Sequence, residues 1–243
     1  MKFAILADIH GNLMAFEAVL KDLEKRGGFD KIWCLGDIIG YGPDPSSCIK
    51  YLKQINHSCV AGNHDWAAIG NIDIFEFNDD AASANQWTAM QLTDDDKGYL
   101  HSLRPVIVEQ DFTLVHGSPR EPMWEYLFSI RSAEENLYSF TTSFCLVGHS
   151  HIPLVFEQSQ DGLQLYQPRD GESIKLENKR LIINPGSVGQ PRDHDPRASY
   201  IIYDSDIMTI TYFRVIYDIE TTQRKMTELN LPEYLIYRLN HGM

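Results

Sequence analysis

The stretch KFAILADIHGNL (residues 2–13) decides the expected fold, because an apolar run passes there directly into polar residues and a helix start. The apolar residues before Asp8 predict a short buried strand. Asn12 is a residue type that caps helices, and the apolar residues after it recur at helical spacing up to Leu23. The run is too short for the apolar region of a signal peptide, and no small-residue cleavage site follows it. We therefore interpret the stretch as a strand followed by a helix of the folded protein.

The same alternation continues along the next fifty residues. KIWCLGD (31–37) predicts a second strand, DPSSCIKYLKQI (44–55) a second helix, and HSCVAGN (57–63) a third strand. Strands that alternate with helices predict an α/β domain whose sheet is covered by helices.

The rest of the chain mixes helical and strand patterns. Residues 66–103 read as mostly helical, and Thr93 with Asp96 resembles a helix cap. A last amphipathic segment, about Glu220 to Leu239, predicts one closing helix. Three further segments have strand patterns, namely 106–117, 144–158 and 198–218. The chain has no linker, low-complexity tract or repeat, so we expect a single domain over residues 1–243.

Charge and cysteine usage narrow the function classes. Lys plus Arg total 21 against 34 Asp plus Glu, which gives a formal net charge of −13. Such a field repels polyanions and argues against a nucleic acid partner, although it permits a small positive pocket. No apolar stretch approaches the roughly 20 residues of a membrane span. The four cysteines form no CxxC pair, which indicates a reducing compartment, and we expect a cytoplasmic protein.

Polar side chains follow five of the predicted strands, at the point where each strand ends. They belong to five short clusters, namely Asp8-Ile9-His10, Gly36-Asp37, Gly62-Asn63-His64-Asp65, His116-Gly117 and Gly148-His149-Ser150-His151. A single His or Asp at a strand end is usually a turn or cap residue. Five such clusters indicate a ligand site instead, because the carboxyl ends of strands in open α/β sheets are where ligands bind.

The residue types in these clusters favour metal ions. In extended backbone, residues two apart point the same way, so Asp8 and His10 can share a target, as can His149 and His151. Carboxylate oxygens and imidazole nitrogens suit Mn²⁺, Fe²⁺ or Zn²⁺ better than Ca²⁺. No thiolate is present at any cluster, which argues against a structural zinc site. The candidate ligands are too many for one ion, so a two-metal site fits them.

These clusters together resemble the metallophosphoesterase, or calcineurin-like phosphoesterase, superfamily. All five of its signature blocks occur in order across residues 8–151, and INPGSVGQPRDHDPRASY (183–200) resembles its small bacterial and archaeal branch. The resemblance implies a two-sheet α-β-β-α sandwich with two divalent metal ions. Mn²⁺ is preferred, with Fe, Zn, Ni and Co as alternatives.

The resemblance also assigns roles to the clustered residues. It implies that Asp37 bridges the two ions, that His64 faces the phosphate without binding metal, and that Asp65 orients the His64 imidazole. The implied ligands of the first ion are Asp8, His10, Asp37 and His151, and those of the second are Asp37, Asn63, His116 and His149. Two divalent ions bring four positive charges against two carboxylates, so the pocket would be locally positive.

Three residues outside the clusters are candidates for substrate contact. They are Tyr41 in GYGPDP (40–45), Arg120 in HGSPREPMWEYLF (116–128), and Arg192 in the 183–200 stretch. Each also has a plain structural reading, as a turn residue or as a solvated or ion-paired arginine. The family more often carries Gly where this chain has His194, so His194 is not counted as a ligand.

The resemblance implies a metal-dependent phosphoesterase that hydrolyses a small phosphoester with a metal-bridging hydroxide, a phosphodiester being preferred over a phosphomonoester. Two alternatives remain open. One is a nuclease of the same superfamily, and the other is a non-catalytic scaffold that keeps the fold and binds partner proteins.

Overall fold

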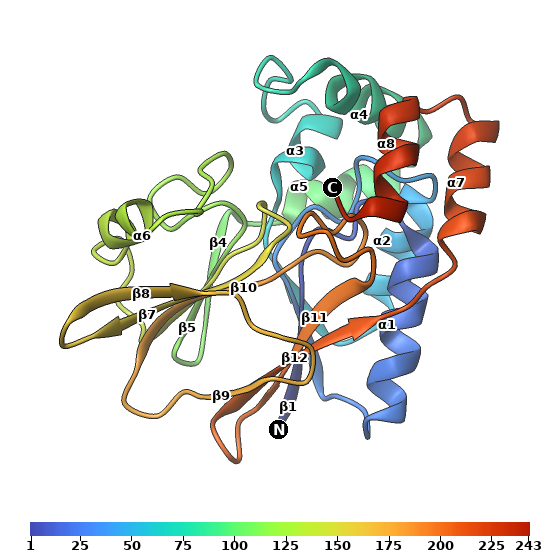
Figure 1. Ribbon diagram of the computed structural model, residues 1–243. Coiled ribbons are helices and arrows are strands. Elements are labelled where there is room, and N and C mark those ends of the chain that lie inside the picture. Colours follow the sequence, from blue (N-terminus) through green and yellow to red (C-terminus); the bar gives the residue numbers. More distant parts are fainter.

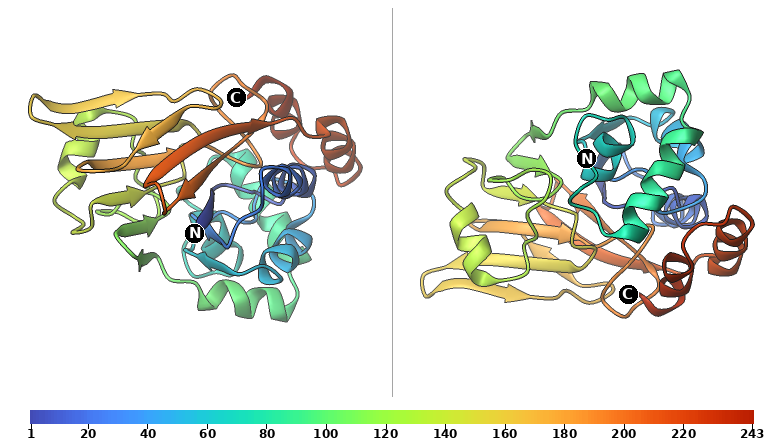
Figure 2. Two further views of the ribbon diagram at one scale, coloured as in Figure 1. Left: turned by 90° about the horizontal axis from the view of Figure 1, so that it is seen from below. Right: turned by 90° about the horizontal axis from the view of Figure 1, so that it is seen from above.

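Strand β1 (Lys2–Leu6) lies in the first of two six-stranded sheets in the computed structural model, which describes residues 1–243 (Figure 1, Figure 2). The order of this sheet is β3 (His57–Cys59), β2 (Lys31–Cys34), β1, β11 (Ala198–Asp204), β12 (Thr209–Val215) and β9 (Ser173–Lys175). Strands β1, β2 and β3 are parallel, and β11, β12 and β9 continue the sheet in antiparallel fashion.

The second sheet has the order β4 (Val106–Glu109), β5 (Phe112–Val115), β6 (Phe144–Leu146), β10 (Arg180–Pro185), β7 (Pro153–Ser159) and β8 (Gly162–Tyr166). Strands β5, β6 and β10 are parallel, whereas β4, β7 and β8 pair antiparallel at the two edges. The segment 144–158 therefore forms two strands of this sheet, and a loop that carries His149 and His151 separates them.

Helices cover both outer sides of the paired sheets. They are α1 (Leu13–Lys25), α2 (Pro45–Lys53), α3 (Asn63–Ala68), α4 (Asp79–Gln91), α5 (Asp94–Ser102), α6 (Ile130–Asn136), α7 (Ile219–Glu228) and α8 (Glu233–Arg238), followed by the 3-10 turn η1 (Leu239–His241). Figure 1 shows α6 beside the β7–β8 hairpin and the other helices gathered on the opposite side of the molecule. No helix combines the length and the apolar character needed to cross a membrane.

Side-chain alternation along β1 explains the layered order. Phe3 and Ile5 point into a core shared by the two sheets, whereas Ala4 and Leu6 point into a second core beneath α1 and α2. Because neighbouring side chains of a strand face opposite sides of the sheet, a continuously apolar strand must be covered on both. A third core lies under α6, on the outer face of the second sheet. The predicted α-β-β-α sandwich is thus confirmed.

The helix caps predicted from the sequence are also present in the structure. The Asn12 side chain accepts a hydrogen bond from the backbone N–H of Ala15 at the start of α1. Thr93 and Asp96 form a capping box at the start of α5.

The expectation of one closing helix is wrong, because the structure has two helices there, α7 and α8. Asn230 between them has a left-handed backbone with φ 54°, and Pro232 directly precedes α8. Neither a left-handed residue nor a proline continues an α-helix, so the chain turns at this point.

Candidate metal centre

All five polar clusters meet at one edge of the paired sheets. Asp8 and His10 follow β1, Asp37 follows β2, Asn63 follows β3, His116 follows β5, and His149 and His151 follow β6. Strands β1 to β3 are parallel to one another, as are β5 and β6, so their carboxyl ends converge. Each of the seven predicted ligands is at most 4% exposed. So many polar groups buried together require partners of high charge or strong hydrogen bonds.

Backbone strain is concentrated at these residues. Of the ten non-glycine residues with positive φ, five are predicted ligands with φ between 50° and 63°, namely Asp8, His10, Asp37, His149 and His151. A left-handed non-glycine residue costs on the order of 1–3 kcal/mol and persists only where its surroundings hold it. Backbone bonds between the loops hold it here: Asp8 N–H donates to Gly36 O (3.1 Å) and His10 N–H to Asp37 O (2.9 Å).

At one position beside the ligands, only glycine fits the space between two loops. A Cβ on Gly62 would overlap both the backbone nitrogen and the Oδ1 of Asp37. Glycine there lets the loop after β3 approach the loop after β2, which brings Asn63 against Asp37.

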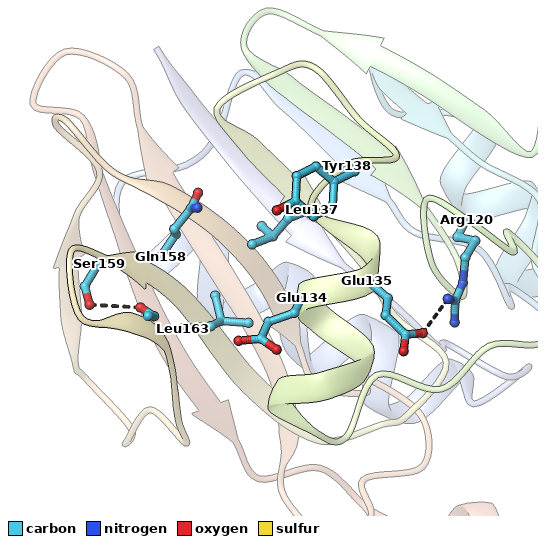
Figure 3. Close-up of a pocket in the computed structure, with 9 residues that line it drawn as sticks. Arg120, Glu134, Glu135, Leu137, Tyr138, Gln158, Ser159 and Leu163 are labelled. Atoms are coloured by element: carbon cyan, nitrogen blue, oxygen red, sulfur yellow. Dashed lines mark hydrogen bonds and ion pairs between the residues drawn. The ribbon is translucent and has the colours of Figure 1, made fainter.

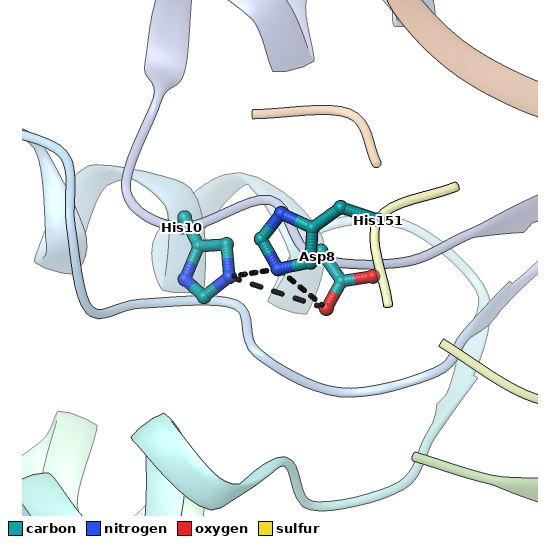
Figure 4. A group of neighbouring side chains, drawn as sticks. All are labelled: Asp8, His10 and His151. Carbon is teal, nitrogen blue, oxygen red and sulfur yellow. Dashed lines mark hydrogen bonds and ion pairs between the residues drawn. The ribbon is translucent and has the colours of Figure 1, made fainter. Parts of the chain in front are cut away.

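The first cluster joins Asp8, His10 and His151 (Figure 4). The Nδ1 atoms of His10 and His151 contact the backbone carbonyls of Ile39 (3.1 Å) and Gln190 (2.6 Å), so each Nδ1 carries the proton and donates it. Burial lowers the pKa of both imidazoles well below the usual value, so both are neutral. Their Nε2 lone pairs then face each other at 3.1 Å. Two acceptors at this distance repel unless a cation lies between them.

The surroundings of Asp8 also indicate a cation between these side chains. Its Oδ1 lies 3.5 Å from His151 Nε2, and its buried Oδ2 has no hydrogen-bond partner. Burial raises the pKa of Asp8 to about 7, although the charge of His116 opposes this rise. A buried carboxylate oxygen and two imidazole lone pairs that converge on one point are a donor set that a divalent ion satisfies.

The second cluster joins Asp37, His116 and His149, with Asn63 beside them. His149 Nε2 contacts Trp124 O at 3.2 Å, which leaves its Nδ1 facing His116 Nε2 at 3.1 Å. Asn63 Oδ1 lies 2.9 Å from the same His116 Nε2. These atoms form a second convergent donor set of nitrogen and oxygen.

Asp37 lies between the two clusters. Its Oδ2 is 3.6 Å from His10 Nε2 and 3.3 Å from His116 Nε2. Burial alone would raise the pKa of Asp37, but the imidazoles of His116 and His64 hold it well below its usual range. Burial alone would lower the pKa of His116, but the Asp37 carboxylate raises it to about 9. The carboxylate is therefore ionised and accessible to both donor sets.

His64 is buried beside Asp37 at the start of α3. Its backbone N–H donates to Asp37 Oδ1 (2.9 Å), and its imidazole Nδ1 has no hydrogen-bond partner. The ring lies against Tyr41, with centroids 4.4 Å apart, and burial lowers its pKa to about 4. His64 also approaches Asp37 and His10 closely enough to share an ion with them.

Asp65 does not contact the His64 imidazole, contrary to the expectation from the resemblance. Its Oδ2 accepts the backbone N–H of Gly62 (3.0 Å), and its Oδ1 accepts those of Ile38 (2.9 Å) and Ile39 (3.2 Å). Asp65 is the third residue of α3, where an acidic side chain turns back to the backbone at the helix start. It thus joins the loops after β2 and β3.

A cavity of about 380 Å³ opens onto these residues. Tyr41 and Arg192, two of the three candidates for substrate contact, line it together with Asp37, Asn63, His64, His149 and His151. Its wall also contains aromatic and arginine side chains outside the five clusters, and one of them, Tyr126, stacks on His149 with centroids 3.9 Å apart. We call this group the outer wall; it consists of Trp124, Tyr126, Tyr234, Arg238 and the already predicted Arg192.

Arg120 lies outside this cavity. It borders an open groove between α6 and the β7–β8 hairpin, where it forms ion pairs with Glu125 and, at 2.5 Å, with Glu135 (Figure 3). His194 belongs to neither cluster: it is exposed, and its backbone N–H donates to Gly242 O at 2.8 Å. Its φ of 65° is one that glycine adopts without strain.

Comparison with known proteins identifies the relatives of this chain. A sequence model of the calcineurin-like phosphoesterase superfamily domain matches residues 1–207. An uncharacterized protein of Methanocaldococcus jannaschii is 39% identical over 245 residues, which cover 98% of this chain and 97% of that protein. The crystal structure of a metallophosphoesterase from Sphaerobacter thermophilus is similar with a TM-score of 0.91 and 45% identity, over 100% of this chain and 99% of that one.

A shorter match involves a symmetrical bis(5'-nucleosyl)-tetraphosphatase of Pseudomonas putida. It is 34% identical over 62 residues, which are 25% of this chain and 22% of that protein.

Proposed function

Because this chain belongs to the calcineurin-like phosphoesterase superfamily and is a hydrolase of phosphoester bonds, we propose that it cleaves a small phosphoester at two divalent metal ions. One ion is assigned to Asp8, His10, Asp37 and His151, and the other to Asp37, Asn63, His116 and His149. We further propose that residues 1–243 form one domain, since the core between the sheets contains side chains from both.

The observation that carries the metal assignment is the pair of facing imidazoles. His10 Nε2 and His151 Nε2 are 3.1 Å apart with both Nδ1 protons committed to backbone carbonyls. The nitrogen and oxygen donors favour Mn²⁺, with Fe, Zn, Ni and Co as alternatives. When bound, two such ions stabilise charge on the phosphate oxygens and lower the pKa of water to near neutrality.

The remaining residues of the site act on the substrate or on the geometry. We assign to His64 a hydrogen bond to the phosphate or leaving-group oxygen, since it lines the cavity with an unsatisfied nitrogen beside Asp37. Tyr41 supports His64 and His10, whose ring centroids both lie 4.4 Å from its own. Asp65 is a positioning residue, because its carboxylate fixes the loops that carry Asp37 and Asn63.

The proposed substrate is a small molecule, with a phosphodiester ahead of a phosphomonoester. The cavity of about 380 Å³ is the size of a small-ligand site, and the net charge of −13 disfavours a long duplex. All candidate ligands are brought together, so a scaffold without catalysis has less support than an enzyme.

The test is hydrolysis of p-nitrophenyl phosphate and bis-p-nitrophenyl phosphate by Mn²⁺-loaded protein, with Asp37→Asn as the control. Faster turnover of the diester would support the phosphodiesterase, and faster turnover of the monoester would make the protein a phosphatase. Binding of two metal ions without turnover of either ester would favour the scaffold. Absence of metal binding would overturn the metal assignment.

A further inference from the structure

Two arginines of the outer wall have no Asp or Glu partner. Arg192 Nη2 donates only to neutral oxygens, those of Gln190 Oε1 (3.0 Å) and Tyr41 Oη (3.3 Å), and its buried Nε has no partner. Arg238 is partly buried, and its Nε donates to the backbone oxygen of Met243. Neither guanidinium pairs with an Asp or Glu side chain, although both line the cavity beside the metal centre.

Three other arginines of the chain pair with carboxylates. Arg214 pairs with Asp193, Arg197 with Asp195, and Arg120 with Glu125. The acidic residues that line the cavity are Asp37, which faces the imidazoles, and Glu76, which is exposed. The positive charge of the outer wall is therefore not paired with an Asp or Glu side chain that lines the cavity. A buried, unbalanced charge is costly, and sites of this kind usually bind an ion of opposite sign.

Both guanidinium groups lie over tyrosine rings that line the cavity. The Tyr41 ring packs on His10 with centroids 4.4 Å apart, and the Arg192 guanidinium carbon lies 5.7 Å from the Tyr41 ring centroid. Arg238 follows over Tyr234, 5.4 Å from that ring centroid. Burial lowers the pKa of Arg238 to about 10, and the like charge of Arg192 acts in the same direction. Two guanidinium groups that affect each other thus share one cavity with the metal-ligand candidates, each of them over a tyrosine ring.

We propose that Arg192 and Arg238 form a second anion subsite, which binds a phosphate group other than the one being hydrolysed. The substrate is then a phosphoester that carries at least one further phosphate. Paired guanidinium groups suit this ligand, because each presents a planar fork of donors to phosphate oxygens. The inference rests on the proposed function, since it places the reacting phosphate at the metal ions.

The subsite is closed by the end of the chain. One apolar cluster joins the α7–α8 region to Tyr41 and to helix α4; its members include Met226, Leu231 and Leu235 from the former and Ala81 and Ala84 from the latter. This packing fixes the position of Arg238 at the end of α8, so the subsite depends on tertiary structure that a local motif does not encode.

The experiment compares two ligands that differ by one phosphorus. Calorimetry on Mn²⁺-loaded protein gives the Kd of inorganic phosphate and of methylenediphosphonate, which is not hydrolysed, at the same free Mn²⁺ concentration. We expect Arg238→Gln to lower the preference for the diphosphonate by about tenfold, as loss of one charged hydrogen-bonding group implies. Arg238→Lys keeps the charge and should retain part of the preference. Arg224→Gln, on the same C-terminal region but outside the cavity, should leave it unchanged.

Two results would overturn the subsite. One is an equal weakening of both ligands by Arg238→Gln, because this would place Arg238 at the reacting phosphate or in the fold alone. The other is an unchanged Kd for both. A failure of the proposed function is distinguishable, because nitrophenyl esters would then not be turned over while both Kd values could still be measured.

Discussion

The two sides of the cavity are built in different ways. On the inner side, the metal-ligand candidates lie within a few residues of strand ends, and five of the seven have backbone in a strained, left-handed form. On the outer wall, Arg192 and Trp124 come from loops, and Arg238 comes from the C-terminal helix α8, which packs on the molecule through Leu235. The inner side has seven polar residues at most 4% exposed, whereas Tyr126 and Tyr234 of the outer wall are 44% and 48% exposed.

This difference in construction assigns catalysis to the inner side and selection between substrates to the outer wall. Metal ions tolerate only small errors in ligand position, and ligands fixed by paired backbone loops meet that demand. A wall built from loop residues and a terminal helix can change without loss of the strands beneath it. We therefore expect substitutions on the inner side to affect kcat, and substitutions on the outer wall to affect affinity and selection between substrates.

The strongest test of the inner side is Asp37→Asn. Asparagine keeps an acceptor for the His64 N–H, so the fold should remain, but it removes the charge that both donor sets face. Metal ions contribute several kcal/mol of charge stabilisation, so we expect kcat/KM to fall by about a thousandfold or more. Steady-state kinetics and metal analysis measure this. The control is Asp161→Asn in the exposed β7–β8 turn, and wild-type turnover by Asp37→Asn would refute the bridging role.

The next effect concerns His64, which lies at the boundary between the two sides. We expect His64→Gln to lower kcat by about 10²–10³ with both metal ions retained, as loss of a positioned acid–base group implies. Metal content is the deciding measurement, because His64 lies near Asp37 and His10 in the structure. Loss of an ion from the His64→Gln protein would make His64 a ligand.

A smaller, pH-dependent effect tests the electrostatics of the inner side. The pKa of His116 in the metal-free protein is raised to about 9 by Asp37, so a metal ion must displace a proton from Nε2 at lower pH. The apparent affinity for Mn²⁺ should therefore rise about tenfold per pH unit between about pH 7 and pH 9. The dependence should steepen below about 7, where Asp8 also holds a proton. Calorimetry in buffers of different ionisation enthalpy counts the protons released, and a flat dependence would contradict this assignment.

The contrast between the two sides also explains what the sequence could predict. Strand β1, helix α1 and the Asn12 cap follow from local periodicity, and the polar residues at strand ends are visible as soon as the strands are placed. Arg238 is not visible in this way, because its position depends on the turn between α7 and α8 and on packing against α4. The left-handed backbone at Asp8 and His10 has only a weak sequence signal, since Asp and His are enriched in that region without being restricted to it.

The position of Asp65 follows the local pattern of a helix N-terminus rather than the role that the resemblance implies. Gly62 and Asp65 have the spacing of a helix cap and the third helical residue, where an acidic side chain bonds back to the cap N–H. The bond forms locally, at low entropic cost, so it competes well against the expected contact with the His64 imidazole.

The cytoplasmic location stays a prediction.

The smallest effect should come from Arg120, which the sequence offered as a substrate contact and the structure places elsewhere. Its guanidinium pairs with Glu125 and Glu135 beside α6, outside the cavity that Arg192 and Arg238 share. Exposed ion pairs contribute little, so Arg120→Gln should change kcat/KM by less than about twofold for any substrate. The comparison with Arg238→Gln is then sharp, because both variants remove one guanidinium and only one of them lies on the outer wall. A rise in KM for Arg120→Gln as large as that for Arg238→Gln would show that the outer wall extends to α6, and the division drawn between the two sides of the cavity would have to be moved.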